Sequence, residues 1–495
     1  MRRWRLFASA GLAGMLAMGL LGAGGADTAA GTTFVNWPQY LYSPAHSSAD
    51  AAATTITPAN AARLTLEWHF SPSKAAISGL SGFLSSPVVY NGVIYIGAKN
   101  GYFYALDETT GAIIWRRFIG YVPKLTCGAQ GFTSTATVAP DPSTGNPTVY
   151  VYGATGYLYA MNAADGTDVW PPAAVAIPST TVNDYYAWSS PLVTAGNIYV
   201  GISSQCDVPL VRGGLDEFSQ ASGALETTFW TTPPGTVGAS IWSSAAADGQ
   251  SIYVTTGNGD PGSDGFSVIQ LDPSLNQQAI WTVPQNQLVA DSDFGGSPGL
   301  WTASLGGVPT AMVGASNKNG TFYAFRTSAL SAGPVWQQKI SQGGANVAAP
   351  LFDGTNLFLA GIHTTIGGVK YQGSVRKVDP ATGGIIWQTG LPGKIIGTPG
   401  MDGAGVIAAA SYGSRGGQNG LWLIDAANGR ILDSISYGTS STFAQPVFAD
   451  GYLFTASQGT LGLRAYITHG AAASPRSQGT LGLRAYTAGG AASPR

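Results

Sequence analysis

Two glycine motifs in the chain have spacings that are typical of nucleotide-binding or catalytic loops. GNGDPG (257–262) satisfies G-x-G-x-x-G, but the following SDGFSVIQLD predicts a strand where a dinucleotide-binding fold needs a helix. GGSPG (295–299) satisfies G-x-S-x-G, but Ser297 and Pro298 begin a predicted strand, which does not fit a nucleophile elbow. Neither motif therefore predicts a nucleotide site or a serine nucleophile.

Histidine and cysteine offer little metal chemistry. The chain has four histidines, His46, His69, His363 and His469. Their spacing does not fit a zinc site. The only cysteines are Cys127 and Cys206, and in an exported chain two cysteines favour a disulfide over a metal site. No CxxCH motif occurs in the 495 residues, so we expect no haem attached to this chain.

Composition indicates a chain of many short strands. The 23 Lys and Arg and 25 Asp and Glu give a net charge of −2, which provides no basic field for nucleic acid. Hydrophobic residues make up 44%, too many for a disordered chain. Glu and Lys are scarce while Gly, Ser, Thr, Val, Tyr and Trp are plentiful, which favours strands joined by turns.

A short motif recurs along the chain at intervals of about fifty residues. ALDETTGAIIW, AMNAADGTDVW and KVDPATGGIIW end at Trp115, Trp170 and Trp387, and degenerate copies end at Trp230, Trp281 and Trp336. LIDAANGRILD keeps its Asp and Gly but has Asp433 in place of the Trp. The pattern predicts an apolar strand that ends at the Asp, a glycine with positive φ, and a second strand that ends on the Trp.

Each copy follows a buried strand and a hairpin, so each unit holds four antiparallel strands. The predicted unit starts are Pro87, Ala136, Pro191, Ala245, Pro298, Pro350, Pro399 and Pro446. Eight such units predict an all-β, eight-bladed β-propeller. The last unit lacks a Trp strand, whereas LTLEWHF (64–70) has a Trp and no unit. We therefore expect the strand of Trp68 to complete the eighth blade and close the ring.

These repeats resemble those of the pyrroloquinoline quinone (PQQ) dehydrogenase superfamily, which includes quinoprotein alcohol dehydrogenases and polyvinyl alcohol dehydrogenase. The resemblance covers residues 35 to 466, and ITPANAARLTLEW (56–68) is similar to the family's lead-in to its first Trp strand. The same propeller also serves non-catalytic scaffolds of outer-membrane assembly, so the fold alone does not establish an enzyme.

The resemblance implies a cofactor site in blades four and five. ASIWSSAAADGQSIYVTTGNGDP (239–261) implies that Trp242 stacks under PQQ and that Asn258 binds both cofactor and Ca²⁺. By the same resemblance, DSDFGGSP (291–298) implies that Asp293 is the catalytic base and a further calcium ligand. Asp291 is a neighbouring acid that could be mistaken for Asp293. GASNKNGTFYAF (314–325) implies that Lys318 hydrogen-bonds the quinone oxygens. Each assignment has a structural alternative: Trp242 could pack between blades, and Asn258 could be a turn residue. Asp293 could cap a strand, and Lys318 could be a solvated turn lysine.

The match is weaker in blade three. GISSQCDVPLVRGG (201–214) resembles the loop that gives the family's Ca²⁺ a glutamate, but no Glu is present. Asp207 is the nearest acid, and Gln205 is a neutral substitute. The adjacent cysteine pair of the family's alcohol dehydrogenases is also absent. The resemblance suggests instead a disulfide between Cys127 and Cys206 that braces two loops beside the pocket.

The two ends of the chain predict export and a tail. Three arginines and an apolar run within residues 1–31 indicate a secretory signal peptide, with an uncleaved membrane anchor as the alternative. We expect the propeller over 32–470, no stable membrane span after cleavage, and a secreted, periplasmic or cell-surface location. SQGTLGLRAYITHGAAASPR (457–476) is repeated almost unchanged at 477–495, so 471–495 is expected to be a tail without function.

The combined expectation is an exported dehydrogenase that oxidises an alcohol with PQQ and Ca²⁺. The substrate would be a small or polymeric alcohol, and the electrons would pass to a separate acceptor such as a cytochrome. The alternative is a PQQ-like propeller that acts as a non-catalytic binding or scaffold protein.

Overall fold

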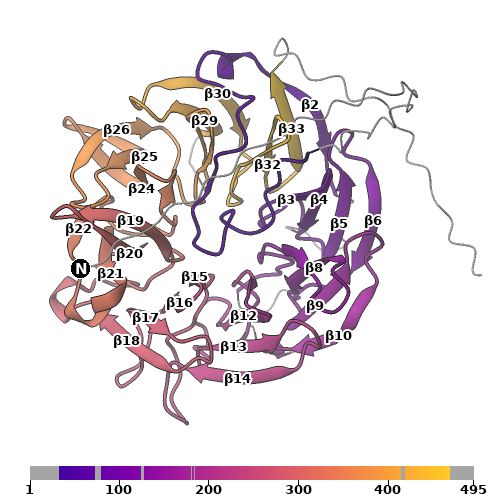
Figure 1. Ribbon diagram of the computed structural model, residues 1–495, viewed down its shortest axis with the longest axis vertical. Coiled ribbons are helices and arrows are strands. Elements are labelled where there is room, and N and C mark those ends of the chain that lie inside the picture. The colour runs from indigo at the N-terminus through magenta and orange to yellow at the C-terminus, as the bar shows by residue number, and fades with distance from the viewer. Residues whose placement is uncertain are drawn as a thin grey trace, which may run out of the picture. The chain divides into compact units, whose positions relative to one another are not determined.

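Eight β-sheets surround a central axis, and each forms one blade of a propeller (Figure 1). The computed structural model describes residues 33–72, 80–123, 127–179, 181–182, 184–413 and 418–468. The expected signal peptide (1–31) and tail (471–495) lie outside the described residues. The prediction of an eight-bladed propeller with four-stranded antiparallel blades is confirmed.

In blades one to six, the four strands run in chain order from the axis to the rim. Blade one contains β3 (Val88–Tyr90), β4 (Val93–Gly97), β5 (Tyr102–Asp107) and β6 (Ile113–Phe118). Blade two contains β7 (Thr137–Pro140), β8 (Pro147–Tyr152), β9 (Tyr157–Asn162) and β10 (Asp168–Ala174). Blade three contains β11 (Leu192–Thr194), β12 (Asn197–Ile202), β13 (Gly214–Ser219) and β14 (Leu225–Trp230). Blade four contains β15 (Ala246–Ala247), β16 (Ile252–Thr255), β17 (Ser267–Leu271) and β18 (Gln277–Thr282).

The second half of the ring repeats this arrangement. Blade five contains β19 (Gly299–Leu305), β20 (Val308–Ser316), β21 (Thr321–Arg326) and β22 (Trp336–Lys339). Blade six contains β23 (Leu351–Phe352), β24 (Leu357–Ile366), β25 (Val369–Val378) and β26 (Ile385–Leu391). Blade seven contains β27 (Gly400–Asp402), β28 (Val406–Ala410), β29 (Asn419–Asp425) and β30 (Ile431–Gly438). Blade eight contains β31 (Val447–Ala449), β32 (Tyr452–Ala456), β33 (Leu463–Thr468) and β2 (Leu64–Phe70). The only helical turns among the described residues are η1 (Ala61–Arg63), η2 (Gln285–Gln287) and η3 (Thr327–Ala332).

The repeat read from the sequence gives the blade boundaries. In every blade, the innermost strand begins one residue after the predicted unit start. One detail of the repeat was wrong in its three clearest copies, where the Trp does not end its strand, whereas Trp230 does end β14. Trp115 is the third residue of β6, which continues to Phe118, and Trp170 and Trp387 are third in β10 and β26. These outer strands continue because their remaining residues still pair with the preceding strand.

The repeated Trp and Gly join neighbouring blades. The Trp115 indole packs on Gly166 of the next blade, where a Cβ would lie 2.7 Å from the ring, and its Nε1 donates a hydrogen bond to the Ala163 oxygen at 2.9 Å. Trp68 packs in the same way on Gly111. Because Gly166 also has a φ of +74°, glycine is required there both by the backbone conformation and by the indole. The motif therefore encodes blade-to-blade packing.

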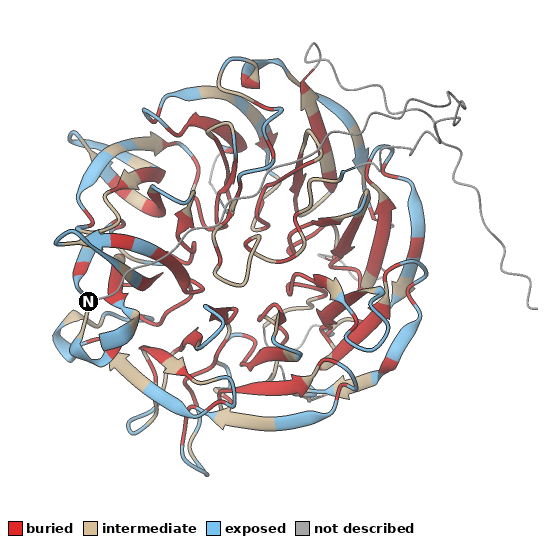
Figure 2. Cartoon of the chain, viewed as in Figure 1, coloured by how far each residue is buried: buried red, intermediate tan, exposed pale blue. Residues whose placement is uncertain are grey.

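The ring is closed by the strand that precedes the first blade. β2 pairs antiparallel with β33, and Trp68 faces Ala465 in the register. This confirms that the strand of Trp68 completes blade eight. The innermost and middle strands are buried, whereas the outermost strands are partly exposed, so the core lies within and between the blades (Figure 2).

A segment near the N-terminus closes one end of the central axis, and the sequence did not predict it. The carbonyl oxygens of Pro38, Pro44 and Ser48 accept hydrogen bonds from inner strands of blades two, four and seven. β1 (Ala49–Asp50) adds a parallel fifth strand to blade seven. In Figure 1 this indigo segment crosses the middle of the ring. A ligand can therefore enter the axis more readily from the opposite end.

Candidate functional site

Eight equivalent residues, one from each blade, meet around the axis. Each lies four positions before the first residue of the blade's inner strand β3, β7, β11, β15, β19, β23, β27 or β31. Together they line one small axial cavity: Leu84, Thr133, Trp188, Trp242, Gly295, Val347, Ile396 and Phe443. The same cavity reaches Tyr40 of the N-terminal segment. Six of the eight also line a larger cavity of about 410 Å³, so this ring is the floor of that cavity.

A belt of hydroxyl groups holds this floor in place. The backbone N–H of Ser86 donates to the hydroxyl of Thr135 at 2.9 Å, and Thr135 donates likewise to Ser190 at 3.0 Å. Ser190 then donates to Ser244, and Ser244 to Ser297, each at 2.9 Å. Because these bonds are buried and cross from one blade to the next, they fix the position of each floor residue relative to its neighbour.

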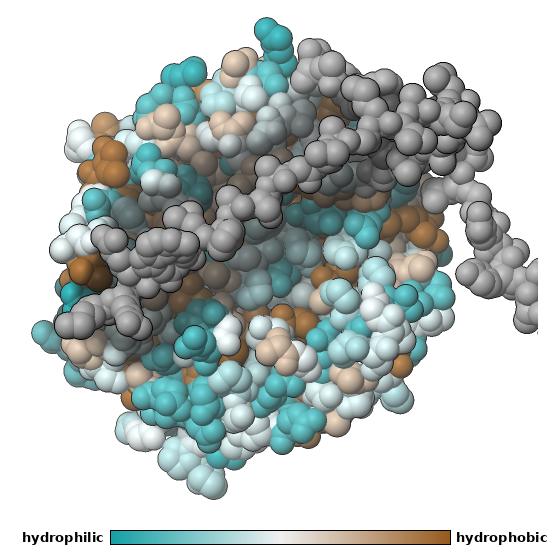
Figure 3. Space-filling view, viewed as in Figure 1, coloured by the Kyte–Doolittle hydropathy of each residue, from teal (hydrophilic) through white to brown (hydrophobic). Residues whose placement is uncertain are grey.

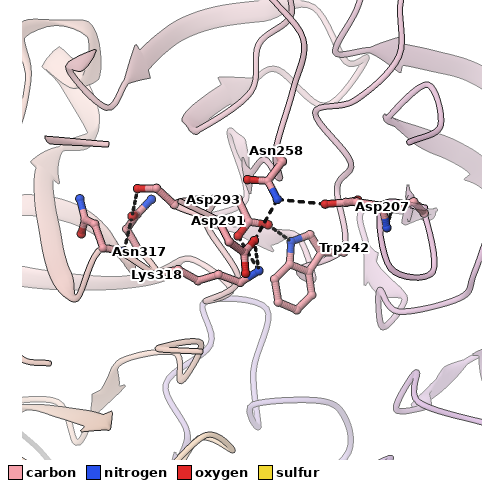
Figure 4. A network of polar contacts seen from close by, with 10 residues as sticks. Asp207, Trp242, Asn258, Asp291, Asp293, Asn317 and Lys318 are labelled. Atoms are coloured by element: carbon pink, nitrogen blue, oxygen red, sulfur yellow. Dashed lines mark hydrogen bonds and ion pairs between the residues drawn. The ribbon is translucent and has the colours of Figure 1, made fainter. Parts of the chain in front are cut away.

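Trp242 occupies the centre of the candidate site (Figure 4). Its Nε1 donates a hydrogen bond to Asp293 Oδ2 at 2.9 Å, and the Lys318 ammonium lies 5.0 Å from the centre of its ring. Gly295 touches the far edge of the indole, and a Cβ there would overlap the ring. Trp188 meets Trp242 edge to face at 6.2 Å. The indole is therefore held in one orientation between the two cavities.

Asp293 and Lys318 form a buried ion pair beside this indole. Lys318 Nζ lies 2.6 Å from Asp293 Oδ1, and their side chains are 14% and 3% exposed. Burial raises the pKa of Asp293 to about 6, although the Lys318 ammonium acts to lower it. Burial alone would lower the pKa of Lys318, but the carboxylates of Asp293 and Asp291 raise it. Asp293 can therefore gain or lose a proton near neutral pH while Lys318 stays charged.

Asn258 links two carboxylates from neighbouring loops. Its Nδ2 donates to Asp207 Oδ2 at 3.0 Å and to Asp291 Oδ1 at 2.9 Å (Figure 4). Asp207 comes from the loop between β12 and β13, and its carboxylate also accepts a hydrogen bond from Ser204. Asp291 in turn accepts from Lys318 at 3.0 Å. All five residues proposed from the sequence as cofactor or metal contacts thus belong to one polar network.

The disulfide predicted between Cys127 and Cys206 is present, with 6.1 Å between the Cα atoms. Cys206 lines the larger cavity, one residue from Asp207. In the same loop, Gln205 Nε2 donates to the Gly128 oxygen at 3.0 Å. The disulfide and this hydrogen bond tie the Asp207 loop to the segment that leads into blade two.

The site fits a flat aromatic ligand and one small cation. An indole floor, a fixed ammonium and an apolar wall that includes Ile396 and Phe443 suit a planar cofactor with oxygen substituents. Carboxylate and amide oxygens suit Ca²⁺. Among the residues that the structure describes, no three His, Cys, Asp or Glu side chains form a cluster of the kind that holds a metal ion.

Two residues of the site were not assigned a role from the sequence. Asp291 was set aside as a neighbour of Asp293, yet it touches both Asn258 and Lys318. Trp188 was not considered, although the sequence carries a signal for it: the triplet Trp-Ser-Ser occurs at 188–190 and again at 242–244, one blade apart. Aligning the repeats on this triplet would have placed Trp188 next to Trp242.

Two sequence families match this chain. The family described as glucose/ethanol/alcohol dehydrogenase, beta-propeller domain (PQQ), matches residues 37–262. A family described as outer membrane protein assembly factor BamB matches residues 300–460. Residues 37–262 are therefore similar to a PQQ-type β-propeller domain, in agreement with the resemblance seen in the repeats.

Curated relatives match this chain over part of their own length. A polyvinylalcohol dehydrogenase from Sphingopyxis is 25% identical over 68% of this chain and 50% of its own length. A quinohemoprotein alcohol dehydrogenase, ADH IIB, from Pseudomonas putida is 24% identical over 60% of this chain and 47% of its own length. The chain therefore spans half or less of these two relatives.

Solved structures agree on the fold. The quinohemoprotein alcohol dehydrogenase from Comamonas testosteroni superimposes with a TM-score of 0.69 at 17% identity, covering 88% of this chain and 80% of that one. A europium-containing methanol dehydrogenase gives a TM-score of 0.67 at 15% identity, covering 87% of this chain and 97% of that one. Within the described part of the chain, no helix has the length and apolar character needed to span a bilayer.

Proposed function

We propose that this protein is an exported quinoprotein dehydrogenase that oxidises an alcohol with PQQ and Ca²⁺ and passes the electrons to a separate acceptor. The observation that carries the proposal is the convergence of Trp242, Asp293 and Lys318 on one cavity. Asn258 is hydrogen-bonded to Asp207 and Asp291, which line the same cavity. Curated relatives with names of this kind support the same function.

In this proposal the floor and the ion pair hold the cofactor. Trp242 offers its ring as a platform, and Lys318 directs its ammonium to oxygens at the edge of the cofactor. Asn258 and Asp207 provide oxygens for the cation, and Asp293 is a further candidate ligand. When bound, PQQ supplies the two-electron acceptor and Ca²⁺ the Lewis acid that polarises it.

Asp293 is the proposed general base. Its carboxylate accepts the proton of the alcohol hydroxyl while the carbon that bears the hydroxyl is oxidised. A pKa of about 6 suits this role, because the group is largely ionised at pH 7 yet still basic enough to take up a proton. The Trp242 N–H donates a hydrogen bond to Asp293 Oδ2, and the Lys318 ammonium contacts Asp293 Oδ1.

The second candidate is a non-catalytic binding propeller. The match of residues 300–460 to the assembly-factor family favours it, as does the absence of the glutamate expected in the Asp207 loop. A scaffold, however, has no need for a buried ion pair beside a cavity of about 410 Å³.

Reconstitution separates the two functions. The purified protein is incubated with PQQ and Ca²⁺, and reduction of an artificial dye is followed with several small alcohols and with a polymeric alcohol. We expect alcohol-dependent dye reduction that needs both additions. The Asp293→Asn variant should lose it while still binding PQQ. Failure to bind PQQ at any Ca²⁺ concentration would leave the scaffold function.

A further inference from the structure

We propose that Asp291 is a direct ligand of the bound cation and replaces the carboxylate that is missing from the blade-three loop. This inference rests on the proposed function and names one more residue of its metal site. It predicts a cation held between the Asp207 loop on one side and the loop that precedes β19 on the other.

The first argument is the position of Asp291. The Asn258 amide nitrogen bonds one oxygen of Asp207 and one of Asp291, so these two oxygens lie no more than about 6 Å apart. The Asp291 side chain is 64% exposed, so it can move slightly toward an ion. Asp207 and Asp291 thus approach the Asn258 amide group from two different loops, and carboxylate and amide oxygens are the ligands that Ca²⁺ takes.

The second argument is charge. The network contains the carboxylates of Asp207, Asp291 and Asp293 but a single ammonium, that of Lys318. Lys318 shares its charge between Asp291 and Asp293, which leaves Asp207 with hydrogen bonds alone. A divalent cation between Asp207 and Asp291 would balance the excess negative charge.

The third argument is a buried oxygen without a hydrogen-bond partner in a residue that lines the same cavity. Gln205 is only 7% exposed and lines the cavity together with Asp207 and Asp291. Its nitrogen is bonded to the Gly128 oxygen, but its Oε1 has no hydrogen-bond partner among the described residues. A buried carboxamide oxygen without a donor is costly unless a ligand meets it, and amide oxygens are good Ca²⁺ ligands.

Calcium titration of the metal-free full chain tests this assignment. Isothermal titration calorimetry measures the Ca²⁺ Kd with and without PQQ for the wild type, Asp291→Asn and Asp291→Glu. The matched control is Asp260→Asn, which removes an exposed carboxylate from the Asn258 loop. We expect Asp291→Asn to weaken Ca²⁺ binding by about tenfold or more, Asp291→Glu to restore much of it, and the control to stay within about twofold.

The outcomes separate the ligand assignment from the proposed function. Equal Ca²⁺ affinity for Asp291→Asn and the wild type would overturn the role of Asp291 and leave the dehydrogenase proposal standing. The same weakening in Asp260→Asn would also overturn it, because the effect would then be one of general charge. If the wild type binds no Ca²⁺ with or without PQQ, the proposed function itself fails, and the ligand assignment fails with it.

Discussion

Removing the ammonium next to Asp293 should move the titration of that carboxyl group to higher pH. In the wild type, burial raises the pKa of Asp293 to about 6, while Lys318 Nζ, 2.6 Å from Oδ1, holds it below the value that burial alone would give. Lys318→Met keeps an apolar stem that is one atom shorter and removes the ammonium, with its charge and its contacts to Asp291 and Asp293. The carboxyl group then keeps the desolvation and loses its counter-ion.

The size of the effect follows from the geometry. A neighbouring opposite charge lowers a carboxyl pKa by about one to three pH units, and this pair is close and largely buried. In Lys318→Met the titration midpoint should therefore move from about 6 into the range of roughly 7 to 9. At pH 7 the carboxyl group would change from about nine-tenths ionised to about half ionised at the lower end of this range and almost fully protonated at the upper end, which would remove about half or more of the proposed base.

Potentiometric difference titration measures this directly. The proton uptake of each protein is compared with that of the same protein carrying Asp293→Asn, so that the difference reports Asp293 alone. Lys370→Met, on the exposed end of the β24–β25 hairpin, serves as the control for loss of one positive charge far from the site. A midpoint in Lys318→Met that is unchanged or lower than in the wild type would refute the ion-pair argument.

Three further predictions concern stability. Cys127→Ser combined with Cys206→Ser opens a disulfide spanning 79 residues and should lower the free energy of unfolding by about 2–4 kcal/mol in denaturant titrations without reductant. Burial raises the pKa of Asp402 to about 7, so the folded state binds this proton more tightly than the unfolded state does. The free energy of unfolding therefore falls as the pH rises from about 4 toward 7. Asp402→Asn should remove up to about 1.4 kcal/mol of that loss per pH unit, as measured by denaturant titrations at several pH values. Gly111→Ala, with a φ of +69° and a Cβ 2.6 Å from an indole, should lower the thermal midpoint more than Gly249→Ala, which has a φ of +88° but open space around its Cβ.

Much of the fold could be predicted because the repeat carries physical information. The glycine of each unit must accept a positive φ and leave room for the indole of the preceding blade, so Gly and Trp recur in register. The start of each inner strand was correspondingly predicted to within one residue. The N-terminal segment from Pro38 to Ser48 escaped prediction because it makes single hydrogen bonds to several blades and has no periodic pattern of its own.

The candidate site could be predicted only in part. Trp242, Asn258, Asp293 and Lys318 were found through family motifs, and they do lie together. Asp291 was not predicted because its role depends on the approach of Asn258 from another loop. The distance between two loops in space cannot be derived from the sequence of either loop. On the uncovered part of the face that Figure 3 shows, apolar residues form separate small patches.

The central claim is that the larger cavity, whose floor includes Trp242, binds PQQ together with a cation. Equilibrium dialysis of the purified chain against PQQ, over a range of Ca²⁺ concentrations, tests it most directly. We predict saturable binding of one PQQ per chain that depends on Ca²⁺ and is strongly weakened in Trp242→Ala. Absence of saturable binding at every Ca²⁺ concentration, or binding that Trp242→Ala leaves unchanged, would contradict it.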